Sequence, residues 1–548
     1  MHMKIHKFLL IGVLIIAFII RFVDFDRTPA LNPDEAALGY NAYSLLLTGK
    51  DEHGVSWPLH FKSFGDYKPG GYVYLALPFV KFLGLTPLAV RLPNLIFSIL
   101  TILFLYKLVL LLSKSSVLAL YSSLVLSLSP WHIHFSRGAW ESSVALSLIV
   151  IGIYYFFKSI KEKFLLNFSL FTLFFILSLY IYHSARLIAP LLALSLVILY
   201  FKFLIKKLPQ IIFPIVFGIL IALPVLFSFL NNGGTARLGG VGLSADMGPI
   251  NRANELINHH NNTKIVNRLM HNKRVLYLVS WAQKYSSHFD LNFLAINGDE
   301  VPRSKSPEVG QIHLIEIFFV FLGLIYLFKS TTAPATTGVF NHKSKIFIIL
   351  FLLISPIASS LTFQAPSALR SLPMVIPLSI LISCGIYYLY ILFLNHKSKI
   401  MNLTILFIII LYSYFIAYYL DSYFLHYAKR YPFAWQYKFD ELVPFVESQK
   451  YHYKNIYITN KYDQPYILFL FYSHYNPLLI QSQIKLTPPD KFGFSTVESY
   501  DNYHFGKIEW DNIPVNSLVI ASDEDIPINP IKIINFSNNK PAFKIYEK

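Results

Sequence analysis

The sequence predicts a mainly α-helical, polytopic membrane protein: a bundle of about eleven spans with interfacial helices on its outer face and a small C-terminal α/β domain. Three observations lead to this fold class. The 548 residues are 55% hydrophobic and 14% charged, with a mean hydropathy of +0.50, whereas soluble proteins carry about 25% charged residues. Long apolar runs recur as far as residue 420. Beyond it, short strand-like runs alternate with helix-like stretches.

Eleven apolar runs are long enough to span the hydrocarbon core of a membrane. They lie at about 8–22, 92–112, 116–130, 143–157, 165–182, 187–204, 210–230, 312–329, 346–362, 371–394 and 401–420. A twelfth segment, at 71–84, is shorter and contains Pro78 and Lys81. No small-residue cleavage site follows the first run, where Arg21 stands instead, so we expect an uncleaved first span.

The distribution of lysine predicts the orientation of the spans. Four turns between the runs are rich in lysine: 158–163, 202–207, 343–345 and 397–399. Such turns are typical of the cytoplasmic side. If Lys4 and Lys7 are also cytoplasmic, the number of crossings places all the lysine-rich turns on the cytoplasmic side only if 71–84 lies in the outer interface without crossing. The protein is then expected in a cell (cytoplasmic) membrane, with the tail and three loops outside: 23–91, 131–142 and 231–311.

The composition and the absent motifs narrow the function. The formal net charge is +17, from 47 basic and 30 acidic residues. Because the lysines cluster in short loops between apolar runs, this balance indicates membrane topology, and we expect no nucleic-acid binding. The single cysteine, Cys384, lies in an apolar run and is expected to pack in the core. The sequence contains no Walker loop, no Gly-x-Gly-x-x-Gly and no His-Glu-x-x-His motif.

The tail predicts a small α/β domain at 421–548, after a transmembrane domain at 1–420 that includes the outer loops. The strand-like runs are Asn455–Thr459, Ser517–Ala521, Ile531–Ile534 and Phe543–Tyr546. Helix-like stretches lie between them, at 434–449 and 463–472. We place this domain on the outer side of the membrane.

Asp34 and Glu35 follow the first span by about a dozen residues, so two negative charges lie close to a membrane surface. One interpretation is structural: Pro33 and the acidic pair begin a helix, because acids favour helix N-termini. The other is functional, because Glu141 lies at the edge of a span in the next outer loop, and carboxylates at membrane edges usually serve a function. Acids that converge on one cavity could supply a general base, a metal site, or both.

Four basic residues at the predicted outer face could bind an anionic lipid head group: Lys68, Arg137, Arg186 and Arg370. Arginines are less expected at outer ends of spans than at inner ends, and a guanidinium group binds phosphate bidentately. The alternatives are structural. Lys68, before Pro69, could be a snorkelling lysine in a turn, Arg137 could pair with Glu141 four residues later, and each arginine could be an ion-pair residue.

Several short motifs together resemble those of the membrane-embedded C-type glycosyltransferases. They are Asp34-Glu35 after the first span, Tyr67-Lys68-Pro69-Gly70 before the interfacial helix, Arg91-Leu92-Pro93 at the start of the next span, and Ser136-Arg137 followed by Glu141. The sequence is most similar to the protein O-mannosyltransferase and aminoarabinose-transferase group (glycosyltransferase family 39), with its RgtA-like bacterial branch. The resemblance covers roughly residues 8–420 in arrangement.

The resemblance implies a helix bundle with a cavity open to the outer leaflet, donor sugars carried on polyprenyl phosphate, and inversion of the anomeric centre. The catalytic acid of the family corresponds to Asp34, with Glu35 beside it, and its second acid corresponds to Glu141. Lys68 matches the lysine that approaches the donor phosphate. A divalent metal ion held by Asp34 and Glu141 is the one cofactor that the resemblance allows, since metal dependence varies across the superfamily.

We therefore expect a hexosyl- or pentosyltransferase that moves a sugar from a polyprenyl-phosphate donor to a lipid, a cell-surface polymer or a protein. Asp34 is the expected general base. The alternative is a transporter or flippase that binds lipid-linked sugars without transfer chemistry. Transporters favour inverted repeats and charges near the middle of the membrane, whereas the charges here gather at the outer edge. A polysaccharide polymerase or ligase would carry catalytic arginines in its large outer loop, and here the acids lie in the first loop.

Overall fold

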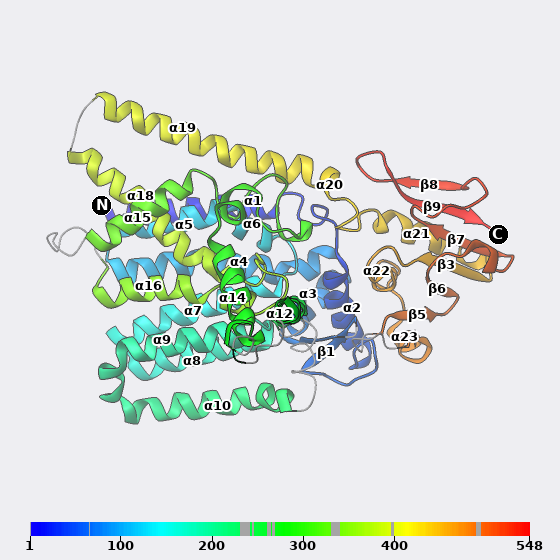
Figure 1. Ribbon diagram of the computed structural model, residues 1–548, viewed down its shortest axis with the longest axis horizontal. Helices are drawn as coiled ribbons and strands as arrows, with labels where there is room; N and C mark the ends of the chain where they lie inside the picture. The colour runs from blue at the N-terminus through cyan, green and yellow to red at the C-terminus, as the bar shows by residue number, and fades with distance from the viewer. Residues whose placement is uncertain are drawn as a thin grey trace. The chain divides into compact units, whose positions relative to one another are not determined.

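Helices dominate the computed structural model, and most of the strands lie near the C-terminus of the chain (Figure 1). The structure describes residues 2–64, 66–230, 242–243, 246–259, 265, 269–329, 340–395, 399–488 and 495–548. Part of the predicted loop 231–311 and Lys397 of the fourth lysine-rich turn lie outside the described residues.

Nine helices in the described part of the chain are long and apolar enough to cross a membrane, as expected of a multi-pass membrane protein. They are α1 (His2–Phe22), α4 (Pro87–Ser113), α7 (Glu141–Lys161), α8 (Phe164–Ile181), α9 (Ala185–Ile205), α10 (Leu208–Leu230), α16 (His342–Ile354) with the short α17 (Ile357–Ser360), α18 (Val375–Asn395) and α19 (Lys399–Asp421).

Two of the eleven predicted spans form helices that are short for a bilayer. Helix α5 (Ser116–Leu128) has 13 residues and α15 (Glu316–Lys329) has 14, so each is about 20 Å long against a hydrocarbon core of about 30 Å. Helix α5 is followed, after a 60° bend, by α6 (Pro130–Ser136), and the bent pair brings the candidate spans to ten. The bend lies beside Pro130, because proline cannot continue a preceding helix.

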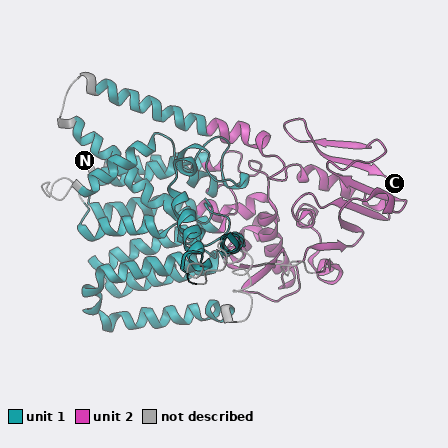
Figure 2. Cartoon of the chain, viewed as in Figure 1, with its two compact units in different colours: residues 1–20, 97–135, 142–419 teal, residues 21–96, 136–141, 420–548 magenta. Residues whose placement is uncertain are grey.

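One compact unit comprises residues 1–20, 97–135 and 142–419 (teal in Figure 2). Between α10 and α15 it contains α12 (Gly248–His259), α14 (Lys273–Ser286), η2 (Ser287–Phe289), η3 (Asn292–Ile296) and η4 (Pro302–Ser304), and η5 (Leu372–Met374) precedes α18. Helices α15 and α18 pack closely. A Cβ atom on Gly323 or Gly385 would collide with the backbone of the other helix, and small residues allow such an approach in membrane bundles.

The second compact unit comprises residues 21–96, 136–141 and 420–548 (magenta in Figure 2). Its first segment contains α2 (Pro33–Thr48), the strands β1 (His60–Ser63) and β2 (Asp66–Pro69), and α3 (Gly71–Leu83). Strands β1 and β2 form an antiparallel hairpin in which Phe61 lies opposite Lys68. Helix α3 corresponds to the predicted interfacial segment, and its 13 residues are too few for a straight span.

The C-terminal part of this unit contains a mixed seven-stranded sheet with the strand order β4-β5-β6-β3-β7-β9-β8. The strands are β3 (Asn455–Thr459), β4 (Lys485–Leu486), β5 (Val497–Tyr500), β6 (Tyr503–Gly506), β7 (Ser517–Ala521), β8 (Lys532–Asn535) and β9 (Pro541–Glu547). The helices are η6 (Ser422–His426), α20 (Tyr427–Arg430), α21 (Phe439–Gln449), η7 (Lys450–His452), α22 (Pro465–Tyr472), α23 (Pro477–Gln483) and η8 (Trp510–Asn512). Strand β3 is parallel to β6 and β7, and the other pairs are antiparallel. All four predicted strands and both helix-like stretches are confirmed.

Helix α2 packs against α3, which is nearby in the sequence, and against α22, which belongs to the tail. Gly39 permits this packing, because a Cβ atom there would lie 2.5 Å from Val90 Cγ2 and 2.8 Å from Phe471 Cε2. Polar contacts extend the same interface: Tyr40 Oη donates to the carbonyl oxygen of Tyr475 at 2.9 Å. The first loop and the tail therefore share one packed interior.

Candidate active site

Helix α2 begins with a capping box. Asn32 is the N-cap: its Oδ1 accepts a hydrogen bond from the Glu35 N–H at 3.1 Å, and Glu35 Oε2 accepts one from the Asn32 N–H at 3.1 Å. Pro33 occupies the first helical position, where its missing N–H would have no helical partner in any case. The box satisfies two backbone donors that the helix end would leave unpaired. The structural interpretation of the acidic pair thus applies to Glu35.

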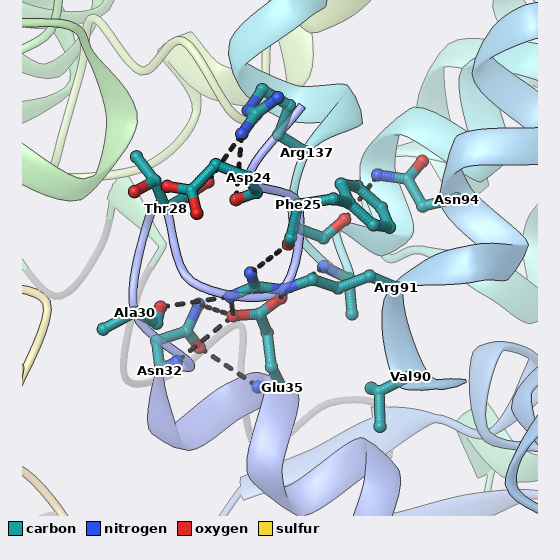
Figure 3. A network of polar contacts seen from close by, with 12 residues as sticks. Asp24, Phe25, Thr28, Ala30, Asn32, Glu35, Val90, Arg91, Asn94 and Arg137 are labelled. Carbon is teal, nitrogen blue, oxygen red and sulfur yellow. Dashed lines mark hydrogen bonds and ion pairs between the residues drawn. The ribbon is translucent and has the colours of Figure 1, made fainter. Parts of the chain in front are cut away.

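Glu35 also forms a bidentate ion pair with Arg91, at the start of α4 (Figure 3). Arg91 Nε donates to Oε1 and Arg91 Nη2 donates to Oε2, each at 2.8 Å. The Ala139 N–H donates to Oε1 at 2.7 Å, and Asn32 Nδ2 donates to Oε2 at 3.1 Å. Glu35 is 1% exposed and Arg91 is fully buried. Protein donors therefore occupy both oxygens of this carboxylate.

Arg91 also holds the chain segment that leads into α2. Its Nη1 donates to the carbonyl oxygen of Phe25 at 2.8 Å, and its Nη2 donates to that of Ala30 at 3.1 Å (Figure 3). One guanidinium group thus binds the acid on α2 and two carbonyls of the preceding segment. This fixes where α2 begins relative to the start of α4.

Arg137 holds the same segment from the loop between α6 and α7. Its guanidinium donates to four carbonyl oxygens at 2.7 to 3.3 Å, those of Arg21, Val23, Asp24 and Thr28. Figure 3 shows Asp24 and Thr28 beside Arg137. It also lies over the rings of Tyr423 and Phe424, at 5.3 and 4.7 Å from their centroids. The Arg137 side chain is fully buried. These contacts show that Arg137 has structural partners in the first loop, and its predicted phosphate-binding role stays a prediction.

Asp34 lies on a different side of α2 from Glu35, because successive helix residues point about 100° apart. Its Oδ1 pairs with Nζ of Lys68, which lies on β2. The Asp34 side chain is 40% exposed and that of Lys68 is 17% exposed. Lys68 Nζ also lies 5.3 Å from the centre of the Phe64 ring. The structure therefore brings together two predicted site residues as a carboxylate and an ammonium group, with the carboxylate partly open.

Glu141 belongs to the same unit and is the first residue of α7. Its side chain is partly exposed. Burial raises the pKa of the Tyr72 phenol, and the charges of Glu35 and Glu141 raise this pKa further. Both acids therefore lie within electrostatic range of Tyr72, which itself donates a hydrogen bond to the carbonyl oxygen of Val90 at 2.9 Å.

Arg186 and Arg370 belong to the other unit and are each partly exposed. Arg186 Nε, in the first turn of α9, donates to the carbonyl oxygen of Leu179 at 3.1 Å. Arg370 Nη1 donates to the carbonyl oxygen of Gln364 at 3.3 Å. Both residues thus have local backbone partners, and their phosphate-binding role stays a prediction.

The sequence reasoning missed Glu52, which lies four residues beyond the end of α2. Glu52 is fully buried, and burial raises the pKa of its carboxyl group to about 8. It also missed the partner of Arg91. The motif Asn32-Pro33-Asp34-Glu35 contains the capping-box signal, an N-cap residue followed three residues later by glutamate. No local signal could reveal a pair 56 residues apart in the chain.

A metal ion at Asp34 and Glu141 finds little support in the geometry. Across the described ranges, no group of three or more His, Cys, Asp or Glu side chains could hold a metal ion. The Asp34 carboxylate is paired with Lys68, and an ammonium group beside a ligand opposes a second cation. The donor set as arranged does not fit a divalent metal site, so we route no chemical step through one.

No protein-family model matches the sequence, and no curated protein matches it significantly. Among solved structures, the oligosaccharyltransferase AglB of Archaeoglobus fulgidus, in complex with an inhibitory peptide and a dolichol-phosphate, is similar with a TM-score of 0.50. The identity is 11%, and the match covers 86% of this chain and 63% of AglB. The structure of the Archaeoglobus fulgidus enzyme tethered with an acceptor peptide also gives a TM-score of 0.50, at 12% identity and the same coverage.

ArnT from Cupriavidus metallidurans, bound to undecaprenyl phosphate, matches with a TM-score of 0.47 and 9% identity over 85% of this chain and 84% of ArnT. The chain spans less than two thirds of the length of the archaeal oligosaccharyltransferase. At these identities the likeness concerns the fold. The fold of this chain is thus similar to that of the archaeal oligosaccharyltransferase.

Proposed function

We propose that this protein is an integral-membrane glycosyltransferase that moves a sugar from a polyprenyl-phosphate donor to a lipid, a cell-surface polymer or a protein. The observation that carries the proposal is the pair of Asp34 and Lys68, a partly exposed carboxylate next to an ammonium group. The neighbouring acid, Glu35, is occupied by protein donors. The fold shared with AglB, a protein solved with a dolichol-phosphate, supports the choice of donor.

Asp34 is the general base of the proposed reaction. Its carboxylate accepts the proton of the acceptor as the acceptor's nucleophilic atom forms a bond to the anomeric carbon of the donor. The bond from that carbon to the phosphate oxygen breaks, and its electron pair stays on the phosphate. The Lys68 ammonium group stabilises the negative charge of this leaving group. Attack from the face opposite the phosphate inverts the anomeric centre.

The ion pair between Asp34 and Lys68 suggests how donor binding prepares the base. Before the donor arrives, the ammonium group neutralises the carboxylate, and a carboxylate next to a cation is a weak base. An incoming phosphate offers Lys68 a second anion. When the phosphate takes over the ammonium group, the Asp34 carboxylate becomes free to accept a proton. Binding of the donor would thus precede activation of the base.

The other predicted residues have supporting roles in this proposal. Glu35, with Arg91, positions α2 and hence Asp34. Glu141 is the second acid, and Arg186 and Arg370 are further candidates for the donor phosphate. The proposal also includes the chemistry of family 39 and a hexose or pentose as the transferred sugar. It places the active site and the C-terminal domain on the outer side of the cytoplasmic membrane. The lysine-rich turns support this orientation.

The test uses the purified full-length protein in liposomes, with a radiolabelled polyprenyl-phosphate sugar and candidate acceptors. We expect Asp34→Asn to lower the transfer rate by about 10²- to 10⁴-fold, as loss of a general base does, while donor binding persists. The matched control is Asp26→Asn, because Asp26 is an exposed acid in the same loop.

Two results would overturn the proposal. Unchanged transfer by Asp34→Asn would remove the base assignment. Movement of the lipid-linked sugar across the bilayer without transfer would show a flippase instead. Chelation of divalent metals is run in parallel, and we expect transfer to persist because Asp34 and Glu141 as arranged do not form a divalent metal site.

A further inference from the structure

Glu52 is a buried acid that the proposed reaction does not use. Its Oε1 accepts a hydrogen bond from Asn41 Nδ2 at 3.4 Å, and its backbone N–H donates to Asn41 Oδ1 at 3.0 Å. Its Oε2 is buried and has no hydrogen-bond partner among the described residues. Buried polar atoms in native proteins nearly always have partners, so such an atom calls for an explanation.

Glu52 lies on the same side of α2 as Asp34, because it is hydrogen-bonded to Asn41. Asp34 and Asn41 are seven positions apart on α2, which is close to two full turns, so their side chains lie on one face of the helix about 10 Å apart. Lys68 pairs with Asp34 on this face. Its positive charge also reaches Glu52, whose carboxyl pKa it lowers.

The charged and titratable groups around Glu52 come from five elements. Tyr40 lies on α2, Asp51 and His53 lie in the loop on either side of Glu52, Lys62 lies on β1, Lys68 lies on β2, and Tyr466 lies on α22. His53 Nε2 is 3.6 Å from Glu52 Oε1. Burial lowers the pKa of the His53 imidazole, and the charge of Lys62 lowers this pKa further, so His53 is uncharged at neutral pH. Of the two lysines, Lys68 is the one whose charge acts on Glu52 itself.

We propose that Glu52 is a positioning residue that competes with Asp34 and the donor phosphate for the Lys68 ammonium group whenever its own carboxyl group is ionised. While Glu52 carries its proton, the Lys68 ammonium group pairs with Asp34 or with the donor phosphate. Once the proton is lost, the unpaired Oε2 becomes a buried acceptor without a donor. The flexible stem of Lys68 ends in three rotatable donors that can meet this need. This inference rests on the proposed roles of Asp34 and Lys68.

Burial holds the Glu52 carboxyl group in its neutral form at neutral pH, because it raises the pKa to about 8. The charge of Asp51 raises this pKa as well, whereas the hydrogen bond from Asn41 and the charge of Lys68 lower it. Above about pH 8 the ionised form prevails and draws the ammonium group away from the donor phosphate. The Michaelis constant for the donor should rise, while the rate at saturating donor changes less.

The first measurement needs no substrate. The infrared band of a protonated carboxyl group is followed in the full-length protein from about pH 6 to about pH 9.5, as the difference between wild type and Glu52→Gln. We expect a carboxylic acid band that belongs to Glu52 and disappears near pH 8. Lys68→Gln should move this midpoint to higher pH, because it removes a cation that favours the ionised form. The proposal would be overturned if the Glu52 band disappears below about pH 6, or if its midpoint is the same in wild type and Lys68→Gln.

The second measurement is the pH profile of kcat/KM for the lipid-linked donor. A single ionisation predicts that wild-type kcat/KM falls about tenfold per pH unit above pH 8, mainly through KM. Glu52→Gln, which cannot ionise at this position, should show no such fall between about pH 8 and about pH 9.5. Glu498→Gln is the matched control, because Glu498 is an exposed acid of the same unit, and it should keep the wild-type profile.

The two measurements also separate this inference from the proposed function. If kcat/KM of Glu52→Gln still falls above pH 8, the positioning role of Glu52 is overturned and Asp34 remains the proposed base. Loss of transfer chemistry in every variant and in wild type would defeat the proposed function, and the infrared titration would still decide whether Glu52 and Lys68 interact. Should Glu52→Gln fail to fold, Glu52→Asp supplies the difference spectrum that assigns the band, and the shift of its midpoint by Lys68→Gln remains as the test.

Discussion

Glu35 and Glu52 are both fully buried carboxyl groups of one compact unit, and α2 connects their surroundings. Glu35 accepts five hydrogen bonds, from Arg91, Asn32 and the Ala139 N–H. Glu52 accepts a single long one, from Asn41. Two equally buried carboxyl groups therefore have opposite surroundings: Glu35 has a charged partner and a donor for each oxygen, whereas Glu52 has one neutral donor.

The comparison also separates residues that stabilise the first loop from residues that are available for chemistry, all within residues 34–52 of the chain. The surroundings of Glu35 are complete, so this acid holds the first loop in place and has no capacity left for a ligand. The surroundings of Glu52 are incomplete, and Asp34 is open to solvent on one side. The variants below test this division, in order of the expected effect on the free energy of unfolding.

Glu35→Gln should cause the largest loss of stability. The substitution keeps the shape of the side chain and leaves the Arg91 guanidinium buried without its counter-charge, which costs about 3–5 kcal/mol in the free energy of unfolding. Chemical unfolding of the protein in detergent measures the loss. Adding Arg91→Met should recover part of it, since replacing both partners of a buried pair costs less than breaking it. A Glu35→Gln protein as stable as wild type would contradict the comparison.

Arg137→Met should lower the free energy of unfolding by about 2–3 kcal/mol, because four carbonyl groups lose a charged donor. Arg137→Lys should rescue little, since one ammonium group cannot reproduce the planar fork. Unfolding together with limited proteolysis of residues 21–30 checks both statements. Normal stability with weakened donor binding would instead return Arg137 to the predicted phosphate site.

Glu52→Gln should mainly change how the free energy of unfolding depends on pH. Between the ordinary value of 4.5 and about 8, the folded protein holds a proton that the unfolded chain has released. Wild-type stability therefore falls as pH rises through this window, by up to about 1.4 kcal/mol per pH unit. The Gln variant lacks this contribution, so the difference between the two unfolding curves should grow from pH 5 to pH 8 in favour of the variant. Parallel curves would show that Glu52 ionises normally.

Asp34→Asn should have the smallest effect on stability, within about 1 kcal/mol, because partly exposed ion pairs contribute little. The same variant should lose most of its transfer activity. Thermal unfolding and transfer assays on one preparation test this contrast. A destabilisation as large as that of Glu35→Gln would show that Asp34 is a structural residue like its neighbour.

Much of the fold could be predicted from local patterns. Hydropathy located each apolar helix, and alternation located four strands of the tail. The span predicted at 116–130 was overestimated because the helix bends beside Pro130, and the span predicted at 312–329 was overestimated at its start, since α15 begins only at Glu316. Strands β4, β5 and β6 of the tail were missed. Strand β4 has only two residues and both are exposed, and β5 and β6 have four residues each, which is short for a pattern of alternating burial to stand out in the sequence.

The candidate site was harder to predict, because its contacts join distant positions. Local spacing predicted the helix that begins at Pro33 and the importance of Asp34. It could not show that Glu35 would pair with Arg91, 56 residues away, or that Lys68 would pair with Asp34, 34 residues away. Glu52 carries no signal of its own, since the residues that interact with it belong to α2, β2 and α22 and come together only in the folded protein.

The packing of α22 on α2 has a consequence for biosynthesis. Tyr40 and its partner Tyr475 are 435 residues apart, and a ribosome that adds about 5–20 residues per second needs tens of seconds to cover that distance. During this interval the loop that bears Asp34 is already made but lacks the segment that completes its interior. Assembly of the first loop is thus a late event, and the protein can gain its chemistry only after nearly the whole chain has been threaded into the membrane.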